Sequence, residues 1–318
     1  MLSLGFLFTL VVLFSMGLVS AIMWKRRRSI EARSIVALYP QLVRFGHVTM
    51  ALRYVGILLG LACFSMWFST GDGKIVVIIP AVMGSLIVIC STVGELVMFN
   101  TARQPGVASL EPRRISAWLP KRLLIRAGVA LAVFIWLVVG SWLIADPDGK
   151  SFTLTGLYQG EALVTSNMGP FLGWFYAGPM VLVTGIFLVL TGIGGWVVAR
   201  RPRNGADPIL ADWDDALRRR SFRGLTATIL AVLCANVLMV SMTTASALDD
   251  VRQIGVNAEL NGVPASQIVI EENLLWYGWG GMKILLWIIA FASFVGFIAA
   301  ASIIVYDTAD PKSNKVLR

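Results

Sequence analysis

Seven long stretches of apolar residues constrain this chain more than any other feature of its sequence. An α-helix needs about 20 residues to cross the hydrocarbon core of a bilayer. The stretches of that length are 3–24, 47–69, 75–99, 123–145, 171–199, 224–247 and 276–306. Only 14% of the 318 residues are charged, whereas soluble domains carry about a quarter. Because no stretch alternates like a membrane β-barrel strand, we expect an all-α fold, a polytopic bundle of seven transmembrane helices.

Arginine and lysine are concentrated in every second connecting segment. The basic segments are 25–46, 100–122 and 200–223, and the last contains seven arginines. The segments between them, which contain one cation each, are 70–74, 146–170 and 248–275. Cations near the ends of spans are retained on the cytoplasmic side. We therefore expect an N-terminus outside the cell, a cytoplasmic C-terminus, and a single transmembrane domain over residues 1–318 whose segments 146–170 and 248–275 are extracytoplasmic.

The first apolar stretch is predicted to be a retained anchor. No cation precedes it, and the run KRRR at 25–28 follows it. A cleaved signal peptide has positive charge before its apolar region instead.

Three ionisable residues, Arg53, Glu95 and Arg126, lie inside predicted spans near their inner ends. An unpaired charge at the centre of a span costs about 3 kcal/mol on insertion scales. Opposite signs at similar depth predict that Glu95 pairs with Arg53 or with Arg126. A role for Glu95 in coupling protons or substrate is the alternative.

Lys283 interrupts the last apolar stretch near its outer end. A lysine stem can lie along apolar surface while its ammonium group reaches water, so we expect Lys283 to be interfacial. An ion pair with Glu271 or Glu272 of the preceding segment is the alternative.

Gly178, Gly185 and Gly192 repeat every seven residues in the fifth stretch and share one helix face. Small residues let helix backbones approach closely in lipid. The repeat predicts a helix-packing seam, and a glycine-lined substrate path is the alternative.

The segment 200–223 is predicted to contain an amphipathic helix that starts at Pro208 and lies at the inner membrane surface. Its acids precede arginines by four residues in the pairs Asp214–Arg218 and Asp215–Arg219, the favourable order on a helix. Docking of a cytoplasmic partner is the alternative for this helix. The residues expected to carry that docking are Trp213, Arg218, Arg219 and Arg220.

The segment 248–275 mixes turn residues with the β-branched run QIVI at 267–270. Such runs are typical of strands. We expect the two long outer segments to form a small extracytoplasmic cap.

Cofactors, metals and catalysis are not predicted. The chain has one histidine, His47, and its three cysteines all lie inside apolar stretches, so neither a histidine metal cluster nor a bis-histidine haem is expected. The net charge of +9 is spread over loops between spans and does not predict nucleic-acid binding. We expect a protein that is not an enzyme.

Three loop motifs carry a resemblance. ARQPG at 102–106, LEPRR at 110–114 with WLP at 118–120, and ADP at 206–208 with DDALRRRS at 214–221 resemble the cytoplasmic loops of multi-span membrane proteins of high-GC Gram-positive (actinobacterial) type. The resemblance covers about a quarter of the chain, implies a plasma-membrane location and supplies no site residues.

Two functions remain open. The first is a transport-related permease or accessory subunit whose basic inner loops dock a cytoplasmic partner such as an ATPase. The second is a structural or scaffolding subunit that binds other membrane subunits. The polar residues that could line a transport path in the sixth stretch are Asn236, Ser241, Thr243 and Thr244.

Overall fold

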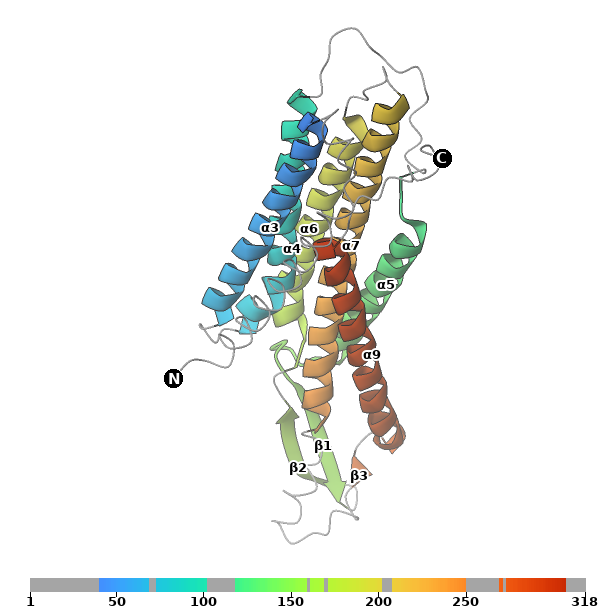
Figure 1. Ribbon diagram of the computed structural model, residues 1–318. Coiled ribbons are helices and arrows are strands. Elements are labelled where there is room, and N and C mark those ends of the chain that lie inside the picture. The colour runs from blue at the N-terminus through green and yellow to red at the C-terminus, as the bar shows by residue number, and fades with distance from the viewer. Residues whose placement is uncertain are drawn as a thin grey trace. The chain divides into compact units, whose positions relative to one another are not determined.

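The computed structural model describes residues 40–68, 73–101, 118–158, 161–168, 171–201, 208–249, 269–270 and 273–306. The helices in this part of the chain are α3 (Pro40–Phe68), α4 (Gly73–Thr101), α5 (Lys121–Ile144), α6 (Trp174–Arg200), α7 (Pro208–Asp249) and α9 (Asn273–Tyr306) (Figure 1). The strands are β1 (Phe152–Tyr158), β2 (Glu161–Met168) and β3 (Val269–Ile270). The predicted span 3–24 lies outside the described residues.

Five of these helices contain a segment long and apolar enough to cross a membrane. The segments are Gly73–Val97, Lys121–Ile144, Trp174–Arg200, Asp214–Leu248 and Gly281–Ile304. The apolar part found in α3, Val48–Phe64, is shorter. The prediction of a helical membrane protein is therefore confirmed.

The chain divides into two compact units. Unit 1 comprises residues 1–127, 183–232 and 298–318, and unit 2 comprises residues 128–182 and 233–297. The helices α5, α6, α7 and α9 each contribute residues to both units.

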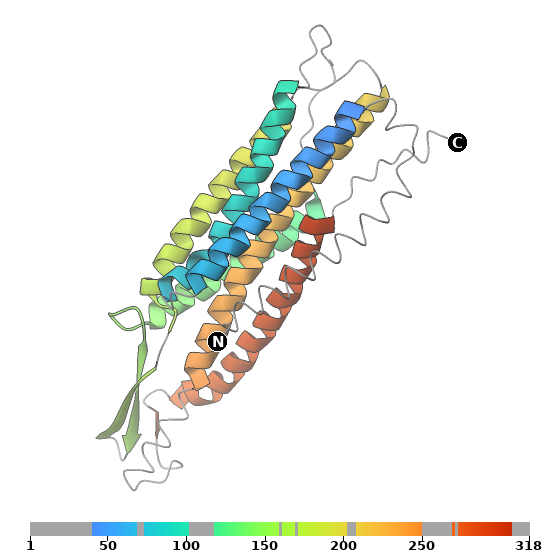
Figure 2. The same cartoon turned by 60° about the vertical axis from the view of Figure 1, so that its left-hand side comes forward.

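In unit 1, α3 and α4 lie side by side in both views (Figures 1 and 2). Glycines permit this close packing, because a Cβ atom at Gly56 would lie 2.8 Å from the Cα of Ile87, and one at Gly60 would lie 3.1 Å from the Cγ of Met83. Backbone at that distance cannot yield without moving a helix, so the approach of α3 to α4 depends on Gly56.

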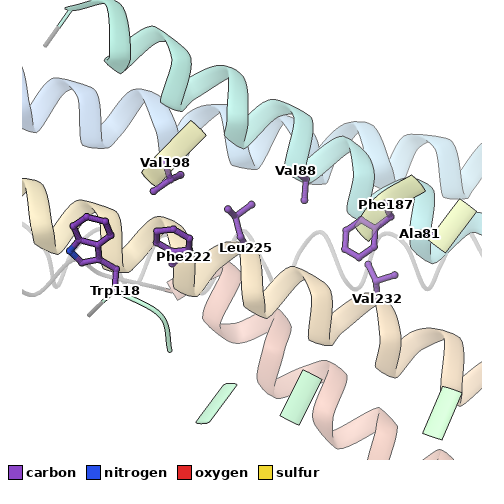
Figure 3. Close-up of a cluster of buried hydrophobic side chains, with 8 residues drawn as sticks. All are labelled: Ala81, Val88, Trp118, Phe187, Val198, Phe222, Leu225 and Val232. Carbon is purple, nitrogen blue, oxygen red and sulfur yellow. The ribbon is translucent and has the colours of Figure 1, made fainter. Parts of the chain in front are cut away.

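The core of unit 1 is a buried apolar cluster contributed by α4, α6, α7 and Trp118, which precedes α5 (Figure 3). Its members are Ala81, Val88, Trp118, Phe187, Val198, Phe222, Leu225 and Val232. The Trp118 and Phe222 rings are stacked at a centroid distance of 6.5 Å. This core positions the polar end of α7 that is described below.

In unit 2, β1 and β2 form an antiparallel hairpin that runs from the pair Phe152–Met168 to the pair Tyr158–Glu161. The two-residue strand β3 pairs with the other edge of β1, giving the order β2-β1-β3. β3 lies within the QIVI run that the sequence singled out as strand-like. The prediction of an all-α fold therefore missed one small sheet of three strands.

A tight turn precedes the hairpin. Gly149 has a φ of 66°, a conformation that other residues rarely adopt. The Asp148 carboxylate accepts hydrogen bonds from the backbone N–H groups of Lys150 at 2.8 Å and of Ser151 at 3.3 Å. These bonds, the Lys150 one first, hold the pKa of Asp148 below its usual value.

Helix α7 is one continuous helix of 42 residues. It begins at Pro208, as the sequence predicts, but it does not stop before the sixth apolar stretch, so the expectation of a separate amphipathic helix is wrong. After Pro208 the segment contains no proline and one glycine, Gly224, so the backbone offers no point at which the helix must end. At 1.5 Å per residue its length is about 63 Å, roughly twice the hydrocarbon thickness.

Candidate functional site: a buried ionic cluster

Five polar side chains are buried together in unit 1. We call them the ionic cluster: Glu95 of α4, Arg201 directly after α6, and Asp214, Arg218 and Ser221 of α7. Both arginines are only 1% exposed, and Glu95 is 5% exposed. Charges buried to this extent are stable only when they are paired and hydrogen-bonded.

Arg201 joins two carboxylates that come from different helices. Its Nη1 donates to Glu95 Oε2 at 2.9 Å, and its Nη2 is paired with Asp214 Oδ1. The Ser221 hydroxyl donates to the second Glu95 oxygen, Oε1, at 2.5 Å. Both oxygens of Glu95 are therefore engaged, and α4, α6 and α7 are connected through polar bonds.

Arg218 caps the C-terminus of α6. Its Nη1 donates to the carbonyl oxygens of Val198 at 3.1 Å and Ala199 at 3.2 Å, and its Nη2 donates to that of Arg201 at 2.7 Å. The last carbonyls of a helix have no partners within the helix and carry partial negative charge. A buried cation at this place satisfies both the hydrogen bonds and the dipole.

Two further contacts hold the guanidinium of Arg218. Its Nε donates to Asp214 Oδ2 at 2.8 Å, which confirms the predicted Asp214–Arg218 pair. The guanidinium also lies over the ring of Trp118, with its carbon 5.0 Å from the ring centroid. Arg218 thus connects α6, α7 and the segment before α5.

A small cavity of about 10 Å³ adjoins the ionic cluster, a volume on the scale of one water molecule. The residues that line it are Thr49, Met50, Arg53, Glu95, Arg201, Leu217, Arg220 and Ser221. Arg53 is 8% exposed, and its guanidinium packs over Gly224, where a Cβ atom would lie 2.6 Å from Nη2. Glycine at position 224 therefore makes room for Arg53.

The predicted charge pairing is correct for Glu95 in kind, but its partner was missed. Arg201 pairs with Glu95, whereas the sequence placed Arg201 in a loop. Arg53 borders the same cavity as Glu95. Arg126 is exposed on α5 and is not a member of the cluster, so the alternative Glu95–Arg126 pair is wrong.

The residues predicted to dock a partner differ in how far they are exposed. Arg218 is wrong as a docking residue because it is buried as the cap of α6. Arg219 is exposed, and Arg220 is half-buried at the cavity. Trp213 belongs to α7, but its side chain lies outside the described residues.

The predicted glycine seam on α6 has no neighbour among the described residues. A Cβ atom at Gly178, Gly185 or Gly192 would meet nothing within 4 Å, and all three are exposed. The close helix contact of α6 instead uses Gly194, where a Cβ atom would lie 2.7 Å from Thr92 Oγ1. A seam formed within the described part of this chain is therefore wrong.

Lys283 is half-buried in α9, between the exposed residues Met282 and Ile284. Its alternative partners Glu271 and Glu272 lie outside the described residues. The interfacial placement of Lys283 therefore stays a prediction.

The polar residues of the sixth stretch lie in α7 within unit 2. Asn236 and Ser241 are fully buried, and the Thr243 hydroxyl donates to the Met239 carbonyl at 2.8 Å. Bonding to a carbonyl of its own helix lets a hydroxyl lie within an apolar bundle.

Sequence reasoning missed Arg201, Ser221, Trp118 and Gly224. One signal was available, because Asp214, Arg218 and Ser221 are spaced i, i+4, i+7 and share one face of a helix. A polar face that continues into an apolar stretch must find polar partners on neighbouring helices.

The four charges of the ionic cluster balance, and every one is bonded. The arrangement can hold helix ends together, and it presents no activated nucleophile. No group of three or more His, Cys, Asp or Glu side chains that could hold a metal occurs among the described residues. No family model, curated protein or solved structure matches this chain.

Proposed function

We propose that this chain is a plasma-membrane protein that crosses the bilayer seven times, with its N-terminus outside and its C-terminus in the cytoplasm. The five apolar helices and the alternation of basic and cation-poor segments support this topology. On this orientation the ionic cluster lies at the cytoplasmic end of the bundle. The loop motifs that resemble actinobacterial membrane proteins support the plasma membrane as its location.

We propose further that it is a transport-related permease or accessory subunit that docks an acidic cytoplasmic partner, such as an ATPase. One observation carries this proposal: every exposed charged side chain described in unit 1 is a cation. These side chains are Lys121, Arg122, Arg126, Arg200, Arg219 and Arg223. A surface of one sign attracts a partner of the opposite sign and speeds association. The role requires no catalytic residue, cofactor or nucleic acid.

Burial of two acidic side chains leaves the exposed surface of unit 1 more positively charged. Glu95 and Asp214 are enclosed in the ionic cluster, where they neutralise Arg201 and Arg218. These two carboxylates are therefore not exposed on the surface that carries the six cations. The buried polar side chains of α7, Asn236 and Ser241, are the residues that a transport path would use.

A structural or scaffolding subunit is the second candidate, and the α6 glycine face favours it. Gly178, Gly185 and Gly192 are exposed and face open space. A helix of another membrane subunit can approach closely at such a face.

Affinity purification of the tagged chain from native membranes in mild detergent tests the choice. An ATPase that co-purifies with wild type and is lost from an Arg219→Gln/Arg223→Gln double variant supports transport. The matched control is Lys150→Gln, an exposed cation of unit 2, which should retain the partner. Membrane subunits that are retained by the arginine variant and lost from Gly185→Leu support scaffolding, and an equal loss from Lys150→Gln contradicts specific docking.

A further inference from the structure

Arg126 is an exposed cation inside an apolar helical segment. It belongs to Lys121–Ile144, the part of α5 that is long and apolar enough to cross a membrane, and its side chain is exposed. The preceding residue, Ile125, is 66% exposed, so this side of α5 faces away from the packed interior. A charged side chain within a span normally faces the interior of the bundle and is paired there. Arg126 departs from that rule.

No described carboxylate neutralises Arg126. Among the described residues it forms no hydrogen bond or ion pair. Glu95 and Asp214 of unit 1 are buried in the ionic cluster, and Asp215 is half-buried. Arg122, which lies four residues earlier on the same face of α5, is a second exposed cation. Because like charges at this spacing repel each other, an anion that contacts both guanidinium groups would stabilise them.

The length of α5 places Arg126 at the boundary of the hydrocarbon. A helix rises 1.5 Å per residue, so Arg126 and Ile144 are about 27 Å apart along the axis, and the hydrocarbon is about 30 Å thick. Asp146 follows two residues after the helix ends. A shift of α5 that carried Arg126 out to water would draw this carboxylate towards the hydrocarbon, which is costly. Arg126 therefore lies at the depth of the lipid headgroups.

Apolar side chains continue the same face of α5 beyond Arg126. Val129 is 60% exposed and Trp136 is 51% exposed. These residues lie three and ten positions after Arg126, so all three fall on one stripe of the helix. A ligand that fits this stripe is anionic at one end and apolar over at least the next two turns.

We propose that Arg122 and Arg126 bind the headgroup phosphate of an anionic phospholipid, one acyl chain of which lies along Val129 and Trp136. Guanidinium groups match phosphate oxygens with paired N–H donors. Cations at the membrane end of a helix attract anionic headgroups. This site requires only that α5 spans the membrane, and it does not depend on the docking of a cytoplasmic partner.

Native mass spectrometry of the full chain tests the proposal. The chain is delipidated in a neutral detergent and titrated with phosphatidylglycerol in one arm and with phosphatidylcholine of the same acyl chains in the other. Phosphatidylglycerol should bind more tightly, because its net charge is negative. Equal binding of the two lipids would contradict the assigned headgroup.

Variants locate the site. Arg126→Gln and Arg122→Gln should each raise the Kd for phosphatidylglycerol at least about tenfold, the effect of losing one charged hydrogen bond. The matched control, Arg219→Gln, removes an exposed cation of α7 and should leave this Kd unchanged. An equal loss from Arg219→Gln would mean general surface attraction and would overturn the proposal.

Thermal unfolding distinguishes a lipid partner from a protein partner. In the delipidated chain, Arg126→Gln should unfold at the wild-type Tm, because the ligand of Arg126 has been removed. Phosphatidylglycerol should then raise the Tm of wild type more than that of the variant. A lower Tm of Arg126→Gln before lipid is added would identify a carboxylate of a protein chain as the partner and would refute the lipid site.

The Arg219→Gln/Arg223→Gln variant keeps this inference separate from the proposed docking function. That variant should lose the cytoplasmic partner and still bind phosphatidylglycerol as wild type does. Loss of lipid binding in it would place the lipid on α7 and contradict the site on α5.

Discussion

Replacing Glu95 with Gln removes one carboxylate from the ionic cluster and keeps the size of the side chain. Glu95 accepts hydrogen bonds from Arg201 at 2.9 Å and from Ser221 at 2.5 Å. Removing one partner of a buried ion pair costs about 3–5 kcal/mol. Asp214 still pairs with Arg201 in the variant, so we expect a loss of about 3 kcal/mol in the free energy of unfolding.

That loss of stability should lower the temperature at which the protein unfolds in detergent. Large domains shift by about 2–4 °C for each kcal/mol, so the Tm of Glu95→Gln should fall by about 6–12 °C, and less protein should be recovered from membranes. Glu111→Gln, in the basic segment 100–122, is the control and should match wild type. A double-mutant cycle with Arg201→Gln should give a coupling energy of about 1–3 kcal/mol. Equal Tm values for the two glutamine variants, or a coupling energy near zero, would refute the reasoning.

Three further perturbations probe separate parts of the account. Arg218→Lys should lose about 1–3 kcal/mol of stability, because an ammonium group cannot cap several carbonyls while it pairs with an acid; thermal unfolding measures this, and Arg219→Lys should be neutral. Gly224→Ala should lower the Tm because its Cβ would lie 2.6 Å from a packed guanidinium, whereas Gly192→Ala should not; equal effects would contradict the packing. The hydrogen bonds that the Asp148 carboxylate accepts should persist at pH values above its usual pKa of 3.8 and be lost as the pH falls through the lowered pKa of the folded protein. Hydrogen exchange at the Lys150 amide should therefore accelerate only in strong acid. Asp148→Asn should abolish this acceleration.

Hydropathy and the low content of charged residues predicted the class of fold, because the lipid around a membrane protein determines both. A bilayer demands long apolar helices, and α4, α5, α6, α7 and α9 each contain one. The start of α7 at Pro208 was also predictable, because proline at the first helical position needs no N–H partner. The continuity of α7 was not predicted, since a boundary was assumed where composition changes from polar to apolar.

The ionic cluster was predictable only in part. Burial of Glu95 required a cation, but three-dimensional packing decided that Arg201 supplies it rather than Arg126. Arg201 follows an apolar stretch and is indistinguishable in sequence from the exposed Arg200. Likewise, a heptad repeat places Gly178, Gly185 and Gly192 on one face but cannot tell which neighbour, if any, covers it.

Labelling of single cysteines in intact cells tests the central claim, a membrane bundle whose basic end lies in the cytoplasm. The three native cysteines, all free, are first replaced by alanine. A membrane-impermeant maleimide should then label the Asp148→Cys variant in intact cells and the Arg219→Cys variant only after permeabilisation. Labelling of Arg219→Cys from outside intact cells would contradict the orientation, and with it the cytoplasmic docking surface.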